Sequence, residues 1–118
     1  MTSNEIQELD SRLNELNRSG KILDGLEEFY AETCVFQEGN EDPIVGKAAQ
    51  RDRLSAMFAT LKGFNGATLH GQAVQGATTF TEWTFDMTGG DDERIIWNEV
   101  LVRHWENGKV VRERFYKA

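Results

Sequence analysis

The stretch WNEVLVRHWENGKVVRERFYKA, residues Trp97–Ala118, predicts a β-hairpin that closes the chain. Apolar and polar residues alternate on both sides of Asn107-Gly108, a pair typical of a two-residue hairpin turn. Such a turn pairs Glu106 with Lys109. Counting back along the strands then predicts three more pairs: His104 with Val111, Val102 with Glu113, and Val100 with Phe115. Because side chains alternate along a strand, these residues share one mainly aliphatic face, which we expect to point into the protein.

Three polar residues on this inward face are candidate functional residues. Glu113 is the strongest, because a carboxylate on a concave apolar wall suits a general base or an anchor for a ligand. The alternative for Glu113 is a structural pairing with a buried arginine or with Tyr30. His104 lies near the end of the hairpin, and Asn98 shares its face and would orient a ligand carbonyl. Both are otherwise core residues whose hydrogen bonds are satisfied within the protein.

The opposite face of the hairpin is expected to contact a second subunit. It carries two tryptophans, a tyrosine and three arginines: Trp97, Glu99, Leu101, Arg103, Trp105, Val110, Arg112, Arg114 and Tyr116. Tryptophan, tyrosine and arginine are the residue types enriched at protein interfaces. We therefore expect a homodimer through this outer sheet face. The alternative is an exposed surface of salt bridges with scattered aromatic residues.

Hydrophobic periodicity predicts three helices followed by four long strands. The helices are expected at residues 4–17, around Ile22–Tyr30, and at 47–62, with Gly63 just beyond the third helix. The strands are expected at 67–74, 78–87, 93–105 and 109–116, with a short strand at 34–38 before the third helix. This order indicates one α+β domain over residues 1–118, with the helices packed in a strongly curved antiparallel sheet.

A cavity between the helices and the curved sheet is the expected site for a small molecule. The residues expected to line it for ligand binding are Tyr30, Met57, Trp83, Asn98, Val100 and Phe115. Trp83 joins this group if Met87 pairs with Arg94, because that register places Trp83 opposite Asn98. Core packing is the alternative role for Tyr30 and Trp83.

The composition excludes several classes of function. A net charge of −7 argues against a nucleic-acid partner, which needs a basic surface. No apolar run is long enough to cross a membrane, and the acidic first residues lack the apolar core of a secretory signal. The single cysteine, Cys34, fits a reducing cytoplasm and is expected to be buried and inert. The two histidines, His70 and His104, lack the spacing of a metal site, and no cofactor motif is present.

Two segments resemble the NTF2-like (cystatin-like) superfamily, which includes ketosteroid isomerases and SnoaL-like polyketide cyclases. LEEFYAETCVFQEGNEDPIVGKAA resembles its helix–strand–loop–helix entry, and WENGKVVRERFY resembles its closing hairpin. The resemblance covers Ile6–Tyr116 and implies a cone-shaped fold that often dimerises through the sheet. It places Glu38 at the general-base position of the isomerases. Val100 stands where their second acid would be, and Arg12 is nearest to their oxyanion tyrosine, which argues against steroid isomerisation.

These observations support three hypotheses of function. The first is a small dimeric cytoplasmic protein that holds a small, mostly apolar ligand in the cone without an assigned reaction. The second is an enzyme of the same fold that performs acid–base chemistry with Glu113, Glu38 and His104, such as an isomerase, cyclase, dehydratase or epoxide hydrolase. The third is a protein-interaction module with a filled core.

Overall fold

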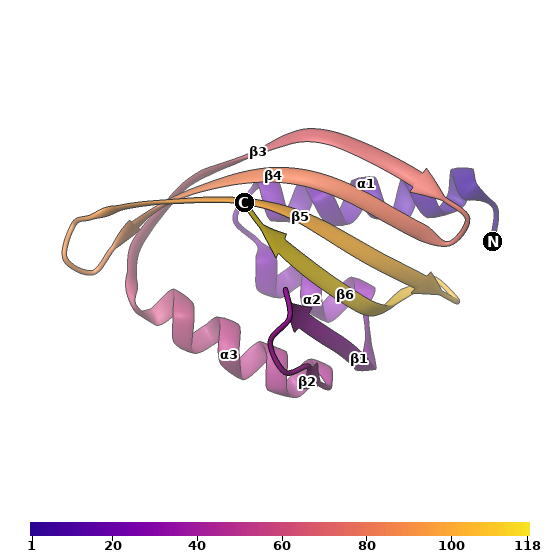
Figure 1. Cartoon of the computed structure of the whole chain (residues 1–118), viewed down its shortest axis with the longest axis horizontal. Helices are drawn as coiled ribbons and strands as arrows, with labels where there is room; N and C mark the ends of the chain where they lie inside the picture. Colours follow the sequence, from indigo (N-terminus) through magenta and orange to yellow (C-terminus); the bar gives the residue numbers. More distant parts are fainter.

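Three helices and six strands make up the protein, as seen in a computed structural model that describes residues 1–118 (Figure 1). The helices are α1 (Ser3–Arg18), α2 (Ile22–Phe29) and α3 (Lys47–Ala59). The strands are β1 (Tyr30–Glu38), β2 (Ile44–Val45), β3 (Leu61–Gln75), β4 (Thr78–Gly89), β5 (Arg94–Glu106) and β6 (Lys109–Lys117). The predicted α+β order is therefore confirmed.

All six strands form one sheet in the order β2-β1-β6-β5-β4-β3. Neighbouring strands are antiparallel except for β1 and β6, which run parallel. The long strands β3, β4 and β5 arch over the helices, and α3 lies at the bottom of the view, away from the arch (Figure 1). A strongly curved sheet that wraps the helices was expected, and its concave face forms the wall of the pocket described below.

Helix α1 begins as the sequence predicts and buries a face that is only partly apolar. Thr2 and Glu5 form the reciprocal hydrogen bonds of a capping box at its start. The buried residues of the helix are Ile6, Asp10, Leu13, Asn14 and Asn17, so three of the five are polar. Helix α1 packs against β3 and β4. This helix therefore delivers polar side chains into the interior, and each needs a partner there or a ligand.

The closing hairpin has the predicted turn but a different register beyond it. Asn107 and Gly108 both have positive φ angles, as a two-residue turn requires, and Glu106 pairs with Lys109. A β-bulge then leaves Val111 without a partner, so Trp105 pairs with Val110 and His104 with Arg112. From that point Arg103 lies opposite Glu113, where Val102 was predicted.

The inward face predicted for the hairpin was therefore correct for β6 beyond the bulge, but wrong for β5 and for Val110, which was assigned to the outer face and is fully buried. A shift of one residue moves every side chain of a strand to the other face. Glu113 and Phe115 point inward as expected. On β5 the inward residues are Trp97, Glu99, Leu101, Arg103 and Trp105, whereas Asn98, Val100, Val102 and His104 lie on the convex face. The surface proposed for dimer contact thus contains several residues that are in fact interior.

Three smaller predictions also need correction. Helix α3 ends at Ala59, so Gly63 belongs to β3 and does not follow the helix. Strand β3 starts at Leu61, well before the predicted residue 67. Met87 pairs with Ile95 and Trp83 with Glu99, one residue away from the predicted register. Trp83 nevertheless points inward, and its side chain is fully buried.

No helix is both long and apolar enough to traverse a lipid bilayer.

Candidate functional site

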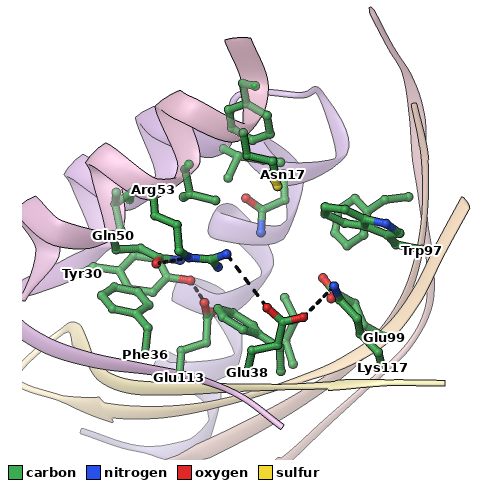
Figure 2. Close-up of a pocket in the computed structure, with 18 of the residues that line it drawn as sticks. Asn17, Tyr30, Phe36, Glu38, Gln50, Arg53, Trp97, Glu99, Glu113 and Lys117 are labelled. Carbon is green, nitrogen blue, oxygen red and sulfur yellow. Dashed lines mark hydrogen bonds and ion pairs between the residues drawn. The ribbon is translucent and has the colours of Figure 1, made fainter. Parts of the chain in front are cut away.

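A pocket opens between the concave face of the sheet and the three helices (Figure 2). Its volume is about 110 Å³. Its apolar walls come from all layers of the fold: Ile22, Leu26, Phe36, Leu54, Met57, Phe58, Phe85, Met87, Trp97, Leu101 and Phe115. The polar residues that line it are Asn17, Tyr30, Glu38, Gln50, Arg53, Glu99, Glu113 and Lys117. An apolar cavity with a few convergent polar groups is the usual form of a small-molecule site.

Glu113 lies on the pocket wall with only one of its two oxygens engaged. The Tyr30 hydroxyl donates a hydrogen bond to Oε2 of Glu113. The same oxygen accepts from Nε of Arg103 at 2.9 Å. No protein group donates to Oε1, and Glu113 is only 4% exposed. Glu113 is thus both a structural partner of Tyr30 and Arg103 and a potential acceptor facing the pocket.

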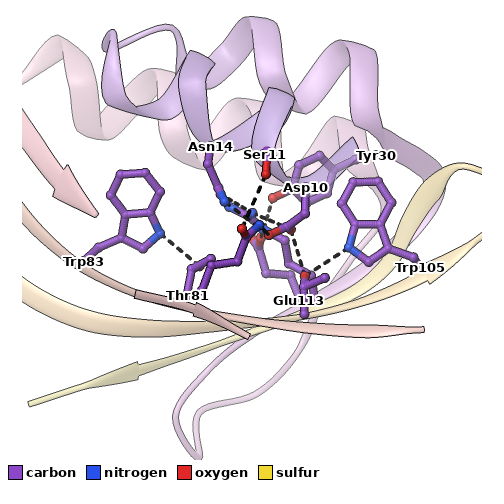
Figure 3. A network of polar contacts seen from close by, with 11 residues as sticks. Asp10, Ser11, Asn14, Tyr30, Thr81, Trp83, Trp105 and Glu113 are labelled. Carbon is purple, nitrogen blue, oxygen red and sulfur yellow. Dashed lines mark hydrogen bonds and ion pairs between the residues drawn. The ribbon is translucent and has the colours of Figure 1, made fainter. Parts of the chain in front are cut away.

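Arg103 lies behind the pocket wall, and Figure 3 shows its partners Asp10, Asn14 and Glu113 close together. Its side chain is fully buried between Glu113 and Asp10, and its Nη1 lies 2.9 Å from Oδ1 of Asp10. Asn14 also accepts from Nη1, at 2.6 Å. Asp10 in turn accepts hydrogen bonds from Thr79 at 2.8 Å and from other polar groups. One buried cation thus lies between two buried carboxylates, which makes removal of either acid costly.

Burial and the neighbouring carboxylate keep the Tyr30 hydroxyl protonated. Burial raises the pKa of Tyr30 well above its ordinary value of 10, and the charge of Glu113 raises it further. The hydroxyl therefore acts as a hydrogen-bond donor to Glu113 at all physiological pH values. The Tyr30 ring stacks on the Phe36 ring, with centroids 5.5 Å apart, and this contact fixes the hydroxyl at the pocket wall.

Charged residues surround the mouth of the pocket. Glu38, at the end of β1, lies 2.6 Å from Nζ of Lys117 and 3.9 Å from Nη1 of Arg53. Nζ of Lys117 also lies 4.5 Å from the centroid of the Trp97 ring, a cation–π distance. Figure 2 shows Glu38 between the two cations. Two cations thus partly neutralise Glu38 at the entrance.

Glu99 has a pKa suited to proton transfer at neutral pH. Burial raises the pKa of its carboxyl from 4.5 to about 7, and the charge of Glu113 contributes in the same direction. Lys117 opposes this change without cancelling it. Glu99 makes no hydrogen bond or close ion pair with the protein, and it lines the pocket. A carboxyl that is half protonated near neutral pH can both give and take a proton.

The structure brings five of the nine predicted site residues to the pocket. They are Tyr30, Glu38, Met57, Glu113 and Phe115. Trp83 is interior but lies outside the pocket, where it stacks on Phe85 and donates to Thr81. His104 was expected to face the cavity, but it is exposed on the convex side and contacts Thr78. Asn98 and Val100 also face that side, because the β-bulge reverses the alternation of β5.

Several residues of the pocket and its support were not predicted. Glu99 and Arg103 were assigned to the outer face, and the bulge that places them inside has no clear sequence signal. Asp10, Asn14 and Asn17 did leave a signal, because they recur at helical spacing on the face that carries Ile6 and Leu13. No cluster of three or more histidine, cysteine or acidic side chains suited to a metal ion occurs in the structure.

The chain belongs to the SnoaL-like domain family, whose model matches residues 12–113. This finding and the structural neighbours confirm the predicted NTF2-like fold. No curated protein matches the chain.

Three solved structures illustrate the range of similar proteins. A protein from Mesorhizobium loti, named as a SnoaL-like polyketide cyclase, is 28% identical with a TM-score of 0.84, covering 98% of this chain and 99% of that one. A LEH-like epoxide hydrolase from M. tuberculosis is 18% identical with a TM-score of 0.78, covering 98% and 84%. An NTF-2 like protein of unknown function from Burkholderia xenovorans is 19% identical with a TM-score of 0.78, covering 98% and 84%. The last two are similar in fold alone.

Proposed function

We propose that this protein binds a small, mostly apolar molecule in the pocket and transfers a proton to or from it. The observation that carries the proposal is the pair of carboxyl groups on the pocket wall, Glu99 and Glu113, in surroundings that are mostly apolar. Glu99 has a pKa of about 7 and serves as the group that donates and recovers the proton. Oε1 of Glu113 accepts a hydrogen bond from the ligand or from a water molecule beside it.

The size of the pocket limits the ligand. A cavity of about 150 Å³ holds one benzene ring, and drug-sized ligands need roughly 300 Å³ or more. At about 110 Å³, this pocket is smaller than that cavity, so one small ring or a short branched chain would already fill it and reach toward the mouth. A longer molecule would extend through the charged mouth, past Glu38, Arg53 and Lys117. Names such as polyketide cyclase and epoxide hydrolase among similar proteins agree with proton transfer on apolar compounds.

Two probe reactions test the proposal. Cyclohexanone in D₂O reports proton transfer at carbon through loss of its α-proton NMR signals, and cyclohexene oxide reports hydrolysis through formation of the diol. We expect at least one reaction to exceed the buffer rate, to show an inflection near pH 7, and to slow at least about tenfold in Glu99→Gln. Equal rates for the wild type and Glu99→Gln at every pH would rule out the acid–base role.

A second candidate function is ligand binding without a reaction. The observation that favours it is the engagement of Glu113, since Oε2 is already held by Tyr30 and Arg103. Binding of both probes with no Glu99-dependent turnover would support this function. The third hypothesis, a protein-interaction module with a filled core, fits the structure less well, because an open pocket lies beside Glu113.

We also propose that two copies associate through the convex face of the sheet. Ile96 and Tyr116 are 44% and 43% exposed there, and Val100 and Val102 add partly exposed aliphatic surface on the same side. Tyr116 lies directly opposite Val100 across the β5–β6 pair. This set replaces Trp97, Arg103 and Trp105, which the structure places inside.

A further inference from the structure

We propose that the amide of Asn17 binds the oxygen of a carbonyl-containing ligand, so that the pocket takes a small apolar ketone or aldehyde. The proposal rests on the proposed function, because it names the class of molecule that occupies the same pocket. It starts from an unusual property of Asn17. The residue is only 6% exposed, yet its side chain makes no hydrogen bond with any protein group.

The lack of a partner for Asn17 is notable beside the other buried asparagine of the same helix. Asn14, one turn earlier, uses both ends of its amide: Nδ2 donates to Asp10 at 3.1 Å and Oδ1 accepts from Arg103 at 2.6 Å. Buried polar side chains are nearly always paired in this way. An unpaired buried amide costs stability, so its presence on a pocket wall indicates a partner that arrives from outside the protein.

The orientation of the Asn17 amide indicates what that partner offers. Its Oδ1 lies toward Gly25 of α2, where a methyl group on the glycine would be 3.5 Å from it. The nitrogen therefore points into the pocket, as Figure 2 shows. Among the described atoms, the only fully buried side-chain nitrogen or oxygen without a partner is Nη2 of Arg103, so the amide nitrogen keeps contact with the cavity. It presents two hydrogens and needs an acceptor.

A second amide supports the same requirement. Gln50 is 2% exposed and lines the pocket from α3. Its Oε1 accepts from Nε of Arg53 at 3.1 Å, and its Nε2 has no partner. Two amide nitrogens thus offer donors with no acceptor in the protein. A carbonyl oxygen has two lone pairs and no hydrogen, which matches this set better than a hydroxyl group that brings its own donor.

The carbonyl assignment also fits the acids across the pocket. With the oxygen held by Asn17, a carbon next to the carbonyl faces the apolar wall that carries Glu99 and Glu113. When the ionised carboxylate of Glu99 removes a proton from that carbon, the C–H electron pair forms the C=C bond of an enolate, and the carbonyl electrons move onto the oxygen. The Asn17 amide donates to that oxygen, and the Glu99 carboxyl, now protonated, returns a proton to the carbon, which restores its carboxylate.

The test compares two probes of nearly equal shape, cyclohexanone and methylenecyclohexane, which differ by one acceptor oxygen. Their dissociation constants are measured by NMR titration for the wild type, Asn17→Leu and Asn14→Leu. We expect the wild type to bind cyclohexanone more tightly than methylenecyclohexane. Asn17→Leu should reduce this preference by about fivefold or more, because it weakens binding of the ketone and leaves binding of methylenecyclohexane unchanged. Thermal unfolding should show Asn17→Leu as stable as the wild type or more so. Asn14→Leu should lower the melting temperature, because it breaks two buried hydrogen bonds.

Each outcome decides the proposal. A wild type that does not prefer the ketone, or an Asn17→Leu variant that weakens both probes equally, overturns it. Marked destabilisation by Asn17→Leu with the preference intact assigns the amide to the scaffold and also overturns it. Failure of the acid–base function gives a different result. If the ketone preference is preserved but exchange does not depend on Glu99, Asn17 remains a binding residue and the proposed reaction is wrong. If turnover depends on Glu99 but the ketone preference is absent, the proposed reaction stands and the role of Asn17 is wrong.

Discussion

Replacing Glu99 with glutamine should stabilise the protein, and only above a definite pH. The folded state raises the pKa of Glu99 from 4.5 to about 7, so between these values the folded protein binds more protons than the unfolded chain. Stability contributed by this group is present below pH 4.5 and is lost as the pH rises through 7. At about 1.4 kcal/mol per pKa unit, ionisation of the buried carboxyl costs about 3 kcal/mol. Glu99→Gln removes that cost.

Urea unfolding followed by tryptophan fluorescence measures the effect, since Trp83 and Trp105 are buried. The free energies of unfolding of Glu99→Gln and the wild type should agree below pH 4.5. Above pH 7 the variant should be more stable by up to about 3 kcal/mol. Acids that do not interact with Glu99 cancel in the difference.

Glu82→Gln is the matched control, because Glu82 is exposed on the other face of the neighbouring strand. Its difference from the wild type should stay flat over the same range. A flat difference for Glu99→Gln as well, or a variant that is less stable above pH 7, would falsify the assignment of Glu99 as the group that titrates near neutrality.

Three further outcomes are expected. Glu113→Gln should lower the free energy of unfolding by about 3 kcal/mol, because it removes one of the two acids that compensate the charge of buried Arg103. A loss below about 1 kcal/mol, measured by urea unfolding, would contradict this expectation. Cys34 should react with a thiol reagent far more slowly in the native state than in urea, because its side chain is fully buried and burial raises its pKa to about 12; rapid native labelling counts against it. Sedimentation velocity at micromolar concentration should give a dimer for the wild type and a monomer for Val100→Glu, and a monomeric wild type would exclude the convex-face contact.

The helices and the pocket wall illustrate what local pattern can predict. The three helices and the Asn107-Gly108 turn depend on residues close in sequence, and all were predicted. Glu113 and Phe115 were placed inward correctly, because the alternation of β6 is regular beyond the bulge. Helix periodicity predicted Tyr30 as a pocket residue, and the family resemblance predicted Glu38. Both line the pocket.

The residues of β5 show where local pattern fails. Both faces of β5 carry large apolar side chains, so composition favoured the aliphatic face of Val100 and Val102 over the face of Trp97 and Trp105. The single bulged residue Val111 reverses that choice, and a bulge depends on how two strands twist against each other. Its effect is to bury Arg103, to turn Glu99 toward the pocket and to expose His104.

The sequence by itself determined the order of helices and strands, the hairpin turn and the family, because each follows from spacing, turn chemistry or motif along the chain. Tertiary structure alone decided which polar groups meet. Asp10 and Arg103 are 93 residues apart, and their contact required both helix α1 and the bulged strand to be in place. The unpaired amide of Asn17 and the raised pKa of Glu99 likewise depend on what surrounds a side chain in space, which spacing along one strand or helix does not specify.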